Sequence, residues 1–157
     1  MNFIIRRQLK ELYKNKNSVL NQQIKDKVEE NGFTLWFDYN EKQCYAYTVG
    51  LSDLELPDLI LLGLGKKLSF AILEFIVDDL LLNGEIHEVF EDQTSDRRLY
   101  YQTVKKDIAA FYAIKTMGYS RGNTNFIQVL WPDIDGLYIF QPKFDKKFLA
   151  MQEMTNE

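Results

Sequence analysis

Hydrophobic side chains recur with two different periods along the chain, and the change of period separates helices from strands. In residues 3–14 the apolar positions lie three or four residues apart, as on one face of a helix. Ser18 is a suitable N-cap for a second helix that ends at Asn31-Gly32. From Phe33 onward aromatic and β-branched residues predominate, which is typical of strands. The chain is therefore predicted to open with two helices.

The middle of the chain has the patterns of several strands. Residues 33–39 and 44–49 are separated by a polar turn and predict a β-hairpin. Residues 59–64 are continuously apolar, which is typical of a strand buried on both faces of a sheet. Residues 85–91 and 99–104 predict two further strands. The pattern indicates an α+β fold with a mostly antiparallel sheet of about five strands.

Two further helices are predicted to pack on this sheet. Residues 66–82 carry only a narrow polar stripe, so protein is expected to cover most of this helix. A shorter helix is predicted for residues 108–117, with Asp107 as its N-cap. The tail after Phe144 is also predicted to be helical.

The most distinctive motif is Trp-Pro-Asp-Ile-Asp-Gly, in which an apolar strand leads into two carboxylates held by Pro and Gly. Residues 126–131 and 137–140 are predicted to pair as a hairpin around it. Carboxylates two residues apart can share one cation. Asp133 and Asp135 are therefore candidates for ligand binding, and the alternative is that they only stabilise the turn.

Aromatic residues with polar neighbours suggest a pocket near this motif. Trp131 could line it, while Thr48 and Gln128 supply hydrogen bonds. The alternative is that these aromatic side chains belong to the core. The candidate ligand-binding residues are thus Thr48, Gln128, Trp131, Asp133 and Asp135, and no catalytic residue is assigned.

Other motifs of known chemistry do not match this sequence. A calcium loop that began at Asp133 would need Glu where Phe144 stands. Residues 63–69 lead from a strand into a helix, as phosphate-binding loops do, but a dinucleotide fingerprint would need Gly at Leu68. His87 is the single histidine and has no nucleophile motif beside it. The sequence predicts no metal and no cofactor, and leaves open whether the protein is an enzyme.

Three segments carry a resemblance to a known family. Residues 45–51, 57–64 and 128–136 resemble, in this order, a bacterial family catalogued as domain of unknown function 4262. Its pattern is a "YTVGL" strand, a "PELxxxGL" strand and a "QxxWPDxxG" hairpin. The likeness spans residues 28–145 and implies a shared α+β fold without a known reaction. The chain departs from the pattern at residues 137–140, where the family tends to have Phe-Pro-Trp.

Length and composition indicate one globular domain in a reducing compartment. The chain has 157 residues, 46% of them hydrophobic, which suffices for one core. Cys44 is the single cysteine, so the chain can form neither an internal disulfide nor a cysteine-based zinc site. The N-terminus lacks the pattern of a secretion signal, so a cytoplasmic location is predicted. Residues 1–157 are interpreted as one domain, with a helical extension at 1–31 and a family-like core at 33–145.

Charge is distributed unevenly along the chain. Residues 1–27 hold seven basic and two acidic residues, which leaves a net charge of −9 on the remaining residues. An acidic body repels phosphate backbones, so nucleic-acid binding is disfavoured and a basic protein partner is favoured. The alternative is a merely solvated surface. The longest apolar run, residues 68–82, is too short to span a membrane and carries three carboxylates.

The favoured interpretation is a non-enzymatic binding protein with an acidic protein-interaction surface. An immunity or antitoxin-like inhibitor is one concrete form of it, because charge complementarity would speed association with a basic toxin. The alternative is a small enzyme or ligand-binding domain that uses Asp133 and Asp135, with or without a divalent metal. The sequence predicts no oligomeric state.

Overall fold

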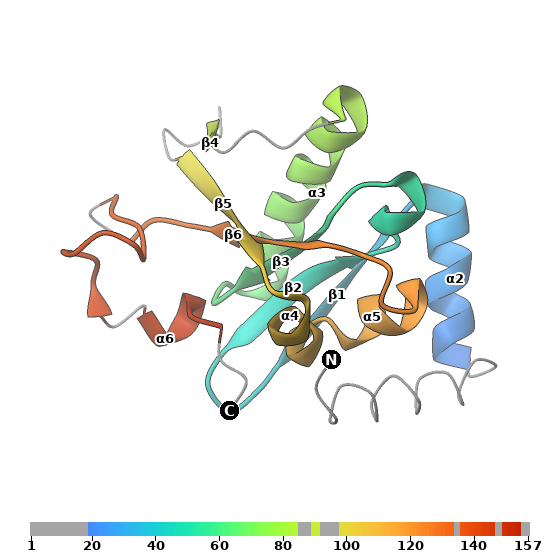
Figure 1. The fold of residues 1–157 in the computed structure, drawn as a ribbon, viewed down its shortest axis with the longest axis horizontal. Helices are drawn as coiled ribbons and strands as arrows, with labels where there is room; N and C mark the ends of the chain where they lie inside the picture. Colours follow the sequence, from blue (N-terminus) through green and yellow to red (C-terminus); the bar gives the residue numbers. More distant parts are fainter. Residues whose placement is uncertain (1–18, 85–88, 92–97, 134–135, 147–148, 155–157) are drawn as a thin grey trace.

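A mixed β-sheet forms the centre of the protein (Figure 1). The computed structural model describes residues 19–84, 89–91, 98–133, 136–146 and 149–154. Within them the sheet has six strands in the order β1-β2-β3-β6-β5-β4. Neighbouring strands are antiparallel except β3 and β6, which are parallel. The predicted α+β class and the mostly antiparallel sheet are confirmed.

The elements have the following bounds. The strands are β1 (Thr34–Tyr39), β2 (Cys44–Val49), β3 (Asp58–Leu62), β4 (Val89–Glu91), β5 (Arg98–Val104) and β6 (Phe126–Leu130). The helices are α2 (Val19–Asn31), α3 (Lys66–Asn83), α4 (Lys106–Tyr112), α5 (Ile114–Ser120) and α6 (Leu149–Gln152), with a 3₁₀ helix η1 (Leu51–Leu54).

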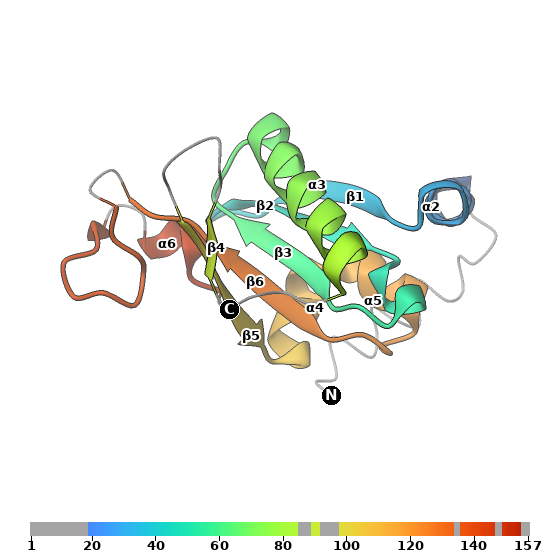
Figure 2. The same ribbon diagram turned by 90° about the horizontal axis from the view of Figure 1, so that it is seen from above.

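Helices cover both faces of the sheet, with α3 on one side and α4 and α5 on the other (Figure 2). Successive residues of a strand point to opposite faces, so β3 can feed two cores. On the α3 side, Leu59 and Leu61 pack with Leu73 and Val77 in one cluster. Ile60 packs with α4 and α5 in the other. The continuously apolar strand predicted at 59–64 thus lies inside the sheet, as expected.

Helix α2 contributes to the core on the α4–α5 side. Its Ile24 and Val28 are buried there. A Cβ at Gly50 would lie only 2.6 Å from Val28 Cγ1, and Gly50 has a φ of +101°. The close approach of α2 therefore requires glycine at this position. The helix expected as an extension is packed against the family-like core, while the helix predicted at 3–14 lies outside the described residues.

Two local predictions are wrong, and neighbouring structure explains both. Residues 137–140 form no strand, because β3 and β5 already occupy the two edges of β6. The helix predicted for 108–117 is divided into α4 and α5 at Ala113, whose ψ of 56° is not helical. The hairpin of β1 and β2 is confirmed, and of the strand predicted at 85–91 the structure describes β4.

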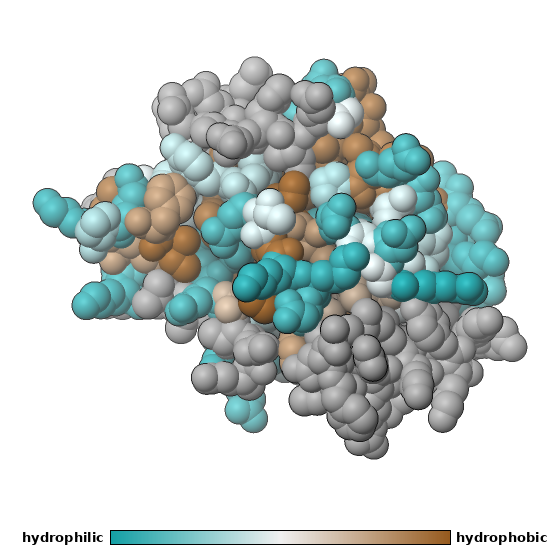
Figure 3. Space-filling model, in the orientation of Figure 1, coloured by the Kyte–Doolittle hydropathy of each residue, from teal (hydrophilic) through white to brown (hydrophobic). Residues whose placement is uncertain are grey.

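One side of α3 remains exposed to solvent. Ser69, Leu73, Ile76, Val77 and Leu80 form its buried side. The opposite side, here called the α3 outer face, consists of Leu68, Phe75 and Leu82 with the neighbouring acidic residues Glu74 and Asp78, all of them exposed. Hydrophobic surface over α3 is visible in Figure 3. Protein thus covers less of this helix than its narrow polar stripe predicted.

Candidate functional site

Trp131 lies in the core at the end where β3 and β6 finish. Its side chain is 9% exposed and packs in the cluster beneath α3. The indole Nε1 donates a hydrogen bond of 2.7 Å to the carbonyl oxygen of Leu62. The side chain of Gln152 accepts from the backbone N–H of Trp131 at 3.1 Å and donates to its carbonyl at 2.9 Å. Trp131 is thereby bound on both its side chain and its backbone.

The segment around α6 closes this end of the sheet. A Cβ at Gly63 would lie 2.7 Å from the carbonyl oxygen of Met151 and 3.0 Å from Trp131 Cζ2. Gln43 donates to the same Met151 carbonyl at 3.3 Å. The backbone of residue 151 is therefore packed directly against the end of β3.

Gln128 is a buried residue in a network of amide groups. Its side-chain oxygen accepts from Gln102 Nε2 at 2.8 Å, and its Nε2 donates to the carbonyl oxygen of Gln152 at 2.6 Å. Only 1% of the residue is exposed. Gln128 thus connects β5, β6 and α6.

The carboxylate of Asp133 turns toward the backbone of its own loop. Its Oδ1 accepts from the N–H of Leu137 at 2.8 Å, and its Oδ2 accepts from the N–H of Asp145 at 3.0 Å. The N–H of Gly136 also donates to the Asp133 carbonyl at 3.0 Å. These contacts hold the Trp-Pro-Asp loop together, and Asp135 lies outside the described residues.

Thr48 contacts a different part of the molecule from Asp133. Its hydroxyl donates to Asp58 Oδ1 at 2.8 Å and accepts from the N–H of Leu59 at 2.9 Å. These groups lie where β3 begins, whereas Asp133 follows the end of β6, which runs parallel to β3. Four of the five predicted site residues are thus described. Trp131 and Gln128 share Gln152 as a hydrogen-bond partner. Thr48 and Asp133 each belong to a separate network.

Asp58 is a buried carboxylate that the sequence prediction missed. It is fully buried and accepts hydrogen bonds from Thr48, from Thr124 Oγ1 at 2.6 Å and from the Leu51 N–H at 3.4 Å. Burial raises the pKa of Asp58 to about 6, and the hydrogen bonds from Thr124 and Thr48 limit this shift. The available signal was an aspartate directly after Pro57, at the entrance to an apolar strand.

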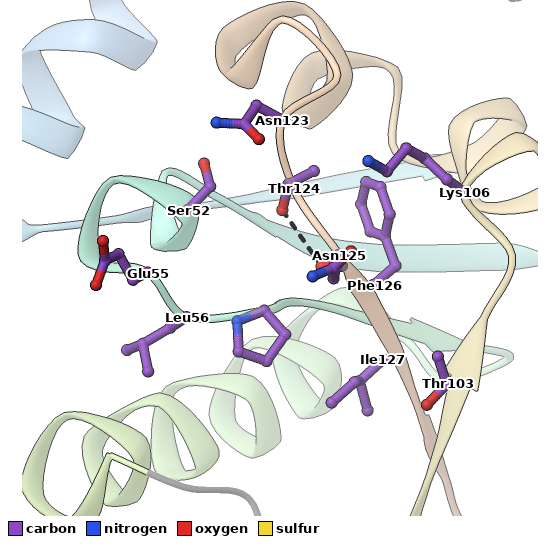
Figure 4. A pocket seen from close by; sticks show the side chains of 11 residues that line it. Ser52, Glu55, Leu56, Thr103, Lys106, Asn123, Thr124, Asn125, Phe126 and Ile127 are labelled. Atoms are coloured by element: carbon purple, nitrogen blue, oxygen red, sulfur yellow. Dashed lines mark hydrogen bonds between the residues drawn. The ribbon is translucent and has the colours of Figure 1, made fainter. Parts of the chain in front are cut away.

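A cleft of about 700 Å³ opens beside this carboxylate (Figure 4). It lies where β3 and β6 begin and β5 ends, between the η1 turn and the start of α4. The lining residues are Ser52, Glu55, Leu56, Pro57, Thr103, Lys106, Asn123, Thr124, Asn125, Phe126 and Ile127. None of the four predicted site residues that the structure describes lines this cleft.

Glu55 and Lys106 bring opposite charges to the cleft from different walls. Glu55 follows η1 and Lys106 begins α4 (Figure 4). Both side chains are exposed, and neither has a hydrogen bond or an ion pair with another described residue. The two charged groups are therefore available to a bound molecule.

The wall that carries Glu55 is tied to α5. The hydroxyl of Tyr119 donates to Asp53 Oδ2 at 2.5 Å, and that of Thr116 donates to the Thr48 carbonyl at 2.5 Å. Both donors belong to α5, whereas Asp53 lies in η1 and Thr48 in β2. These contacts hold the η1 turn in place relative to the sheet.

The described residues offer no ready metal site. Within these ranges no three His, Cys, Asp or Glu side chains gather closely enough to hold a metal ion. His87 lies outside them, as does Asp135. None of the described helices is both long enough and apolar enough to cross a membrane.

Comparison with protein families agrees with the resemblance carried by the three motifs. Residues 27–145 match the model of a family described as a domain of unknown function, DUF4262. The chain belongs to this family. The matched region contains all six strands, the cleft and the Trp-Pro-Asp loop. Comparisons with curated proteins and with solved structures gave no match.

Proposed function

We propose that this member of the DUF4262 family is a binding protein that engages a basic partner protein through the α3 outer face. The observation that carries the proposal is the exposed row of Leu68, Phe75 and Leu82, which are 53%, 42% and 84% exposed. Large apolar side chains that remain together on a surface commonly mark an interaction site.

Helical geometry places these three side chains on one line. They are seven residues apart, close to two full helical turns, so successive members are rotated by only about 20°. The row extends over about 21 Å along the helix. A second amphipathic helix laid along α3 would contact all three residues, as in recognition through i and i+7 positions.

Charge favours a basic segment as the occupant. From Phe70 to Asn83 every charged residue of α3 is acidic, and Glu74 and Asp78 are exposed beside the apolar row. A partner with Lys or Arg next to its apolar residues would complement both features. An inhibitor that covers a basic surface of a toxin is one form that such a protein would take.

The alternative, an enzyme or ligand-binding domain that uses Asp133 and Asp135, has less support. It requires these side chains to face a concave pocket together with Thr48 or Gln128. The Asp133 carboxylate instead accepts two backbone N–H groups of its own loop.

The proposal is tested by affinity purification of the tagged protein from its native host, followed by direct binding measurements. The wild type is compared with Phe75→Ala/Leu82→Ala, which removes the apolar row, and with Glu74→Lys/Asp78→Lys, which reverses the charge. Tyr39→Ala is a matched control, because Tyr39 is a 75% exposed aromatic residue of strand β1 and is not part of the α3 outer face.

The expected result is one stoichiometric partner that both α3 variants lose and the control retains. A synthetic peptide that carries the basic amphipathic segment of this partner should then bind the wild type in calorimetry and not the α3 variants. A partner that still binds both α3 double variants would count against the proposal. So would a partner that has no basic amphipathic segment.

A further inference from the structure

We propose that the cleft between η1 and α4 binds a small zwitterion, of the class of free amino acids and short peptides. The ammonium group of the ligand lies at Glu55 and its carboxylate at Lys106. This inference concerns a different surface from the α3 outer face and does not depend on the function proposed there.

The charge arrangement identifies the class of ligand. A cleft lined by one sign of charge would select an anion or a cation, whereas this cleft carries one carboxylate and one ammonium group. They lie on opposite sides of the opening in Figure 4, where the Lys106 ammonium group extends over the cleft and the exposed Glu55 carboxylate is turned outward at the rim. Rotation about the Glu55 side-chain bonds brings its carboxylate to a bound ligand. A ligand with charges at both ends pairs with both groups at once.

The remaining lining suits a peptide-like molecule. Asn123 and Asn125 each supply a hydrogen-bond donor and an acceptor, which matches the N–H and C=O groups of an amide. Leu56, Pro57 and Ile127 provide apolar surface for a side chain. The volume of about 700 Å³ lies within the range typical of small-molecule sites, roughly 300–1,000 Å³.

The backbone at Glu55 provides a separate argument for a role of its side chain. Glu55 has a φ of 59° and a ψ of 28°, the left-handed conformation that glycine adopts with the least strain. A side chain kept in such a conformation at the rim of a cleft is a reason to expect a functional role. Here the side chain is a carboxylate that has no hydrogen bond or ion pair with another described residue.

The floor of the cleft is fixed to the buried carboxylate beneath it. Thr124 lines the cleft and donates from Oγ1 to Asp58 Oδ2, and Asp58 donates from its N–H to the Asn125 carbonyl at 2.8 Å. Two lining residues are thus held by one buried residue, one through its carboxylate and one through its backbone N–H. A preformed floor reduces the entropy lost when a ligand binds.

The test is a binding survey of the full chain by ligand-observed NMR and calorimetry. The probes are the free amino acids, a set of di- and tripeptides, and N-acetylated and C-amidated forms of any that bind. We expect at least one unblocked probe to bind, and each blocked form to bind at least about tenfold more weakly. These arms also distinguish a free amino acid from a peptide as the ligand.

Matched variants connect binding to the two charged residues. Glu55→Gln and Lys106→Gln should each weaken binding of the same probe at least about tenfold. Glu41→Gln and Lys42→Gln, which remove the same charges from the turn between β1 and β2, should leave the affinity unchanged. Tm measurements on all four variants verify that they are folded.

Glu55→Gly tests the contribution of the side chain to ligand binding separately from its effect on the stability of the fold. It should raise the Tm, because glycine relieves the left-handed backbone, and still weaken binding at least about tenfold. Arg121→Gly is the control at a second residue with positive φ, 55°, outside the cleft. It should raise the Tm and leave the affinity unchanged.

Two results would overturn the inference. One is that no probe binds at concentrations up to about 10 mM, because any interaction weaker than that would be too weak to fill the cleft. The other is a ligand whose acetylated or amidated form binds as well as the zwitterion. Neither result would affect the partner proposed for the α3 outer face.

Discussion

The two ends of the parallel strand pair β3–β6 have similar residues but differ in how accessible they are to solvent. Each end has a buried aspartate, Asp58 where the strands begin and Asp133 after they finish. Around Asp133 and Trp131 the segment of α6 closes the surface. Around Asp58 the chain leaves a cleft whose walls carry Glu55 and Lys106.

In this protein a distinctive motif and an open cleft thus occupy opposite ends of one sheet. Asp133 accepts hydrogen bonds from backbone N–H groups, and Trp131 donates to a backbone carbonyl. Such contacts fix a loop, and they are a sufficient reason for a Trp-Pro-Asp sequence. The cleft instead combines residues from five places in the chain, so no local sequence motif predicts it.

The largest expected effect is that of Trp131→Ala at the closed end. The substitution removes a buried indole and its hydrogen bond to Leu62, so we expect the free energy of unfolding to fall by about 3–5 kcal/mol. Urea denaturation measures it. Trp131→Phe, which keeps most of the buried surface, should cost clearly less. An alanine variant with unchanged stability would show that Trp131 contributes little to the core.

The second largest effect is a pH dependence of the unfolding free energy that comes from Asp58, the aspartate beside the cleft. Asp58 has a folded-state pKa of about 6, above its ordinary value of 3.8, so the folded protein binds the extra proton between these pH values. The stabilisation associated with this proton is fully present below about pH 4 and is lost as the pH rises to about 6. The total change is on the order of 3 kcal/mol.

Comparison of the wild type with Asp58→Asn isolates this contribution. The difference in unfolding free energy, wild type minus variant, should be largest below about pH 4 and fall by on the order of 3 kcal/mol by pH 7. Asp78→Asn on the surface of α3 controls for the removal of a carboxylate in general. A difference between wild type and Asp58→Asn that stays constant with pH would contradict the elevated pKa.

The fold was largely predictable because most of its strands and helices have strong local patterns. The buried strand β3 is a continuous apolar run, and helix α3 is enclosed by glycines at both ends. The prediction failed where a non-local choice decides the structure. Residues 137–140 look like a strand, but β6 had already paired with β3 and β5.

The candidate sites were harder to predict because they depend on which side chains the fold leaves unpaired. Sequence alone does not show that Asp133 would accept two amides, or that Glu55 and Lys106 would border one cleft. Asp58 offered a local hint, since a carboxylate inside an apolar strand must find donors when it is buried. Its donors, Thr48 and Thr124, are 10 and 66 residues away.

A smaller effect is expected at the other aspartate. Asp133→Ala leaves the N–H groups of Leu137 and Asp145 without their carboxylate acceptor, which should lower the unfolding free energy by about 2 kcal/mol. Asp133→Asn retains one acceptor oxygen and should lose about half as much. If ligand binding at the cleft is measured on these variants, its affinity should not change. An affinity that falls with Asp133 would join the two ends of the sheet into one site.

The smallest effect, Glu55→Gly, has the opposite sign and belongs to the cleft. Relief of the left-handed conformation is worth about 1–2 kcal/mol, and the greater freedom of glycine in the unfolded chain offsets about 0.4–1 kcal/mol of it. A net stabilisation of about 0.5–1 kcal/mol should remain in urea denaturation. Glu55→Ala keeps a Cβ and should show no such gain. If Glu55→Gly were neutral or destabilising, the glutamate side chain would itself stabilise the fold, and the strain at the rim would no longer argue for a ligand.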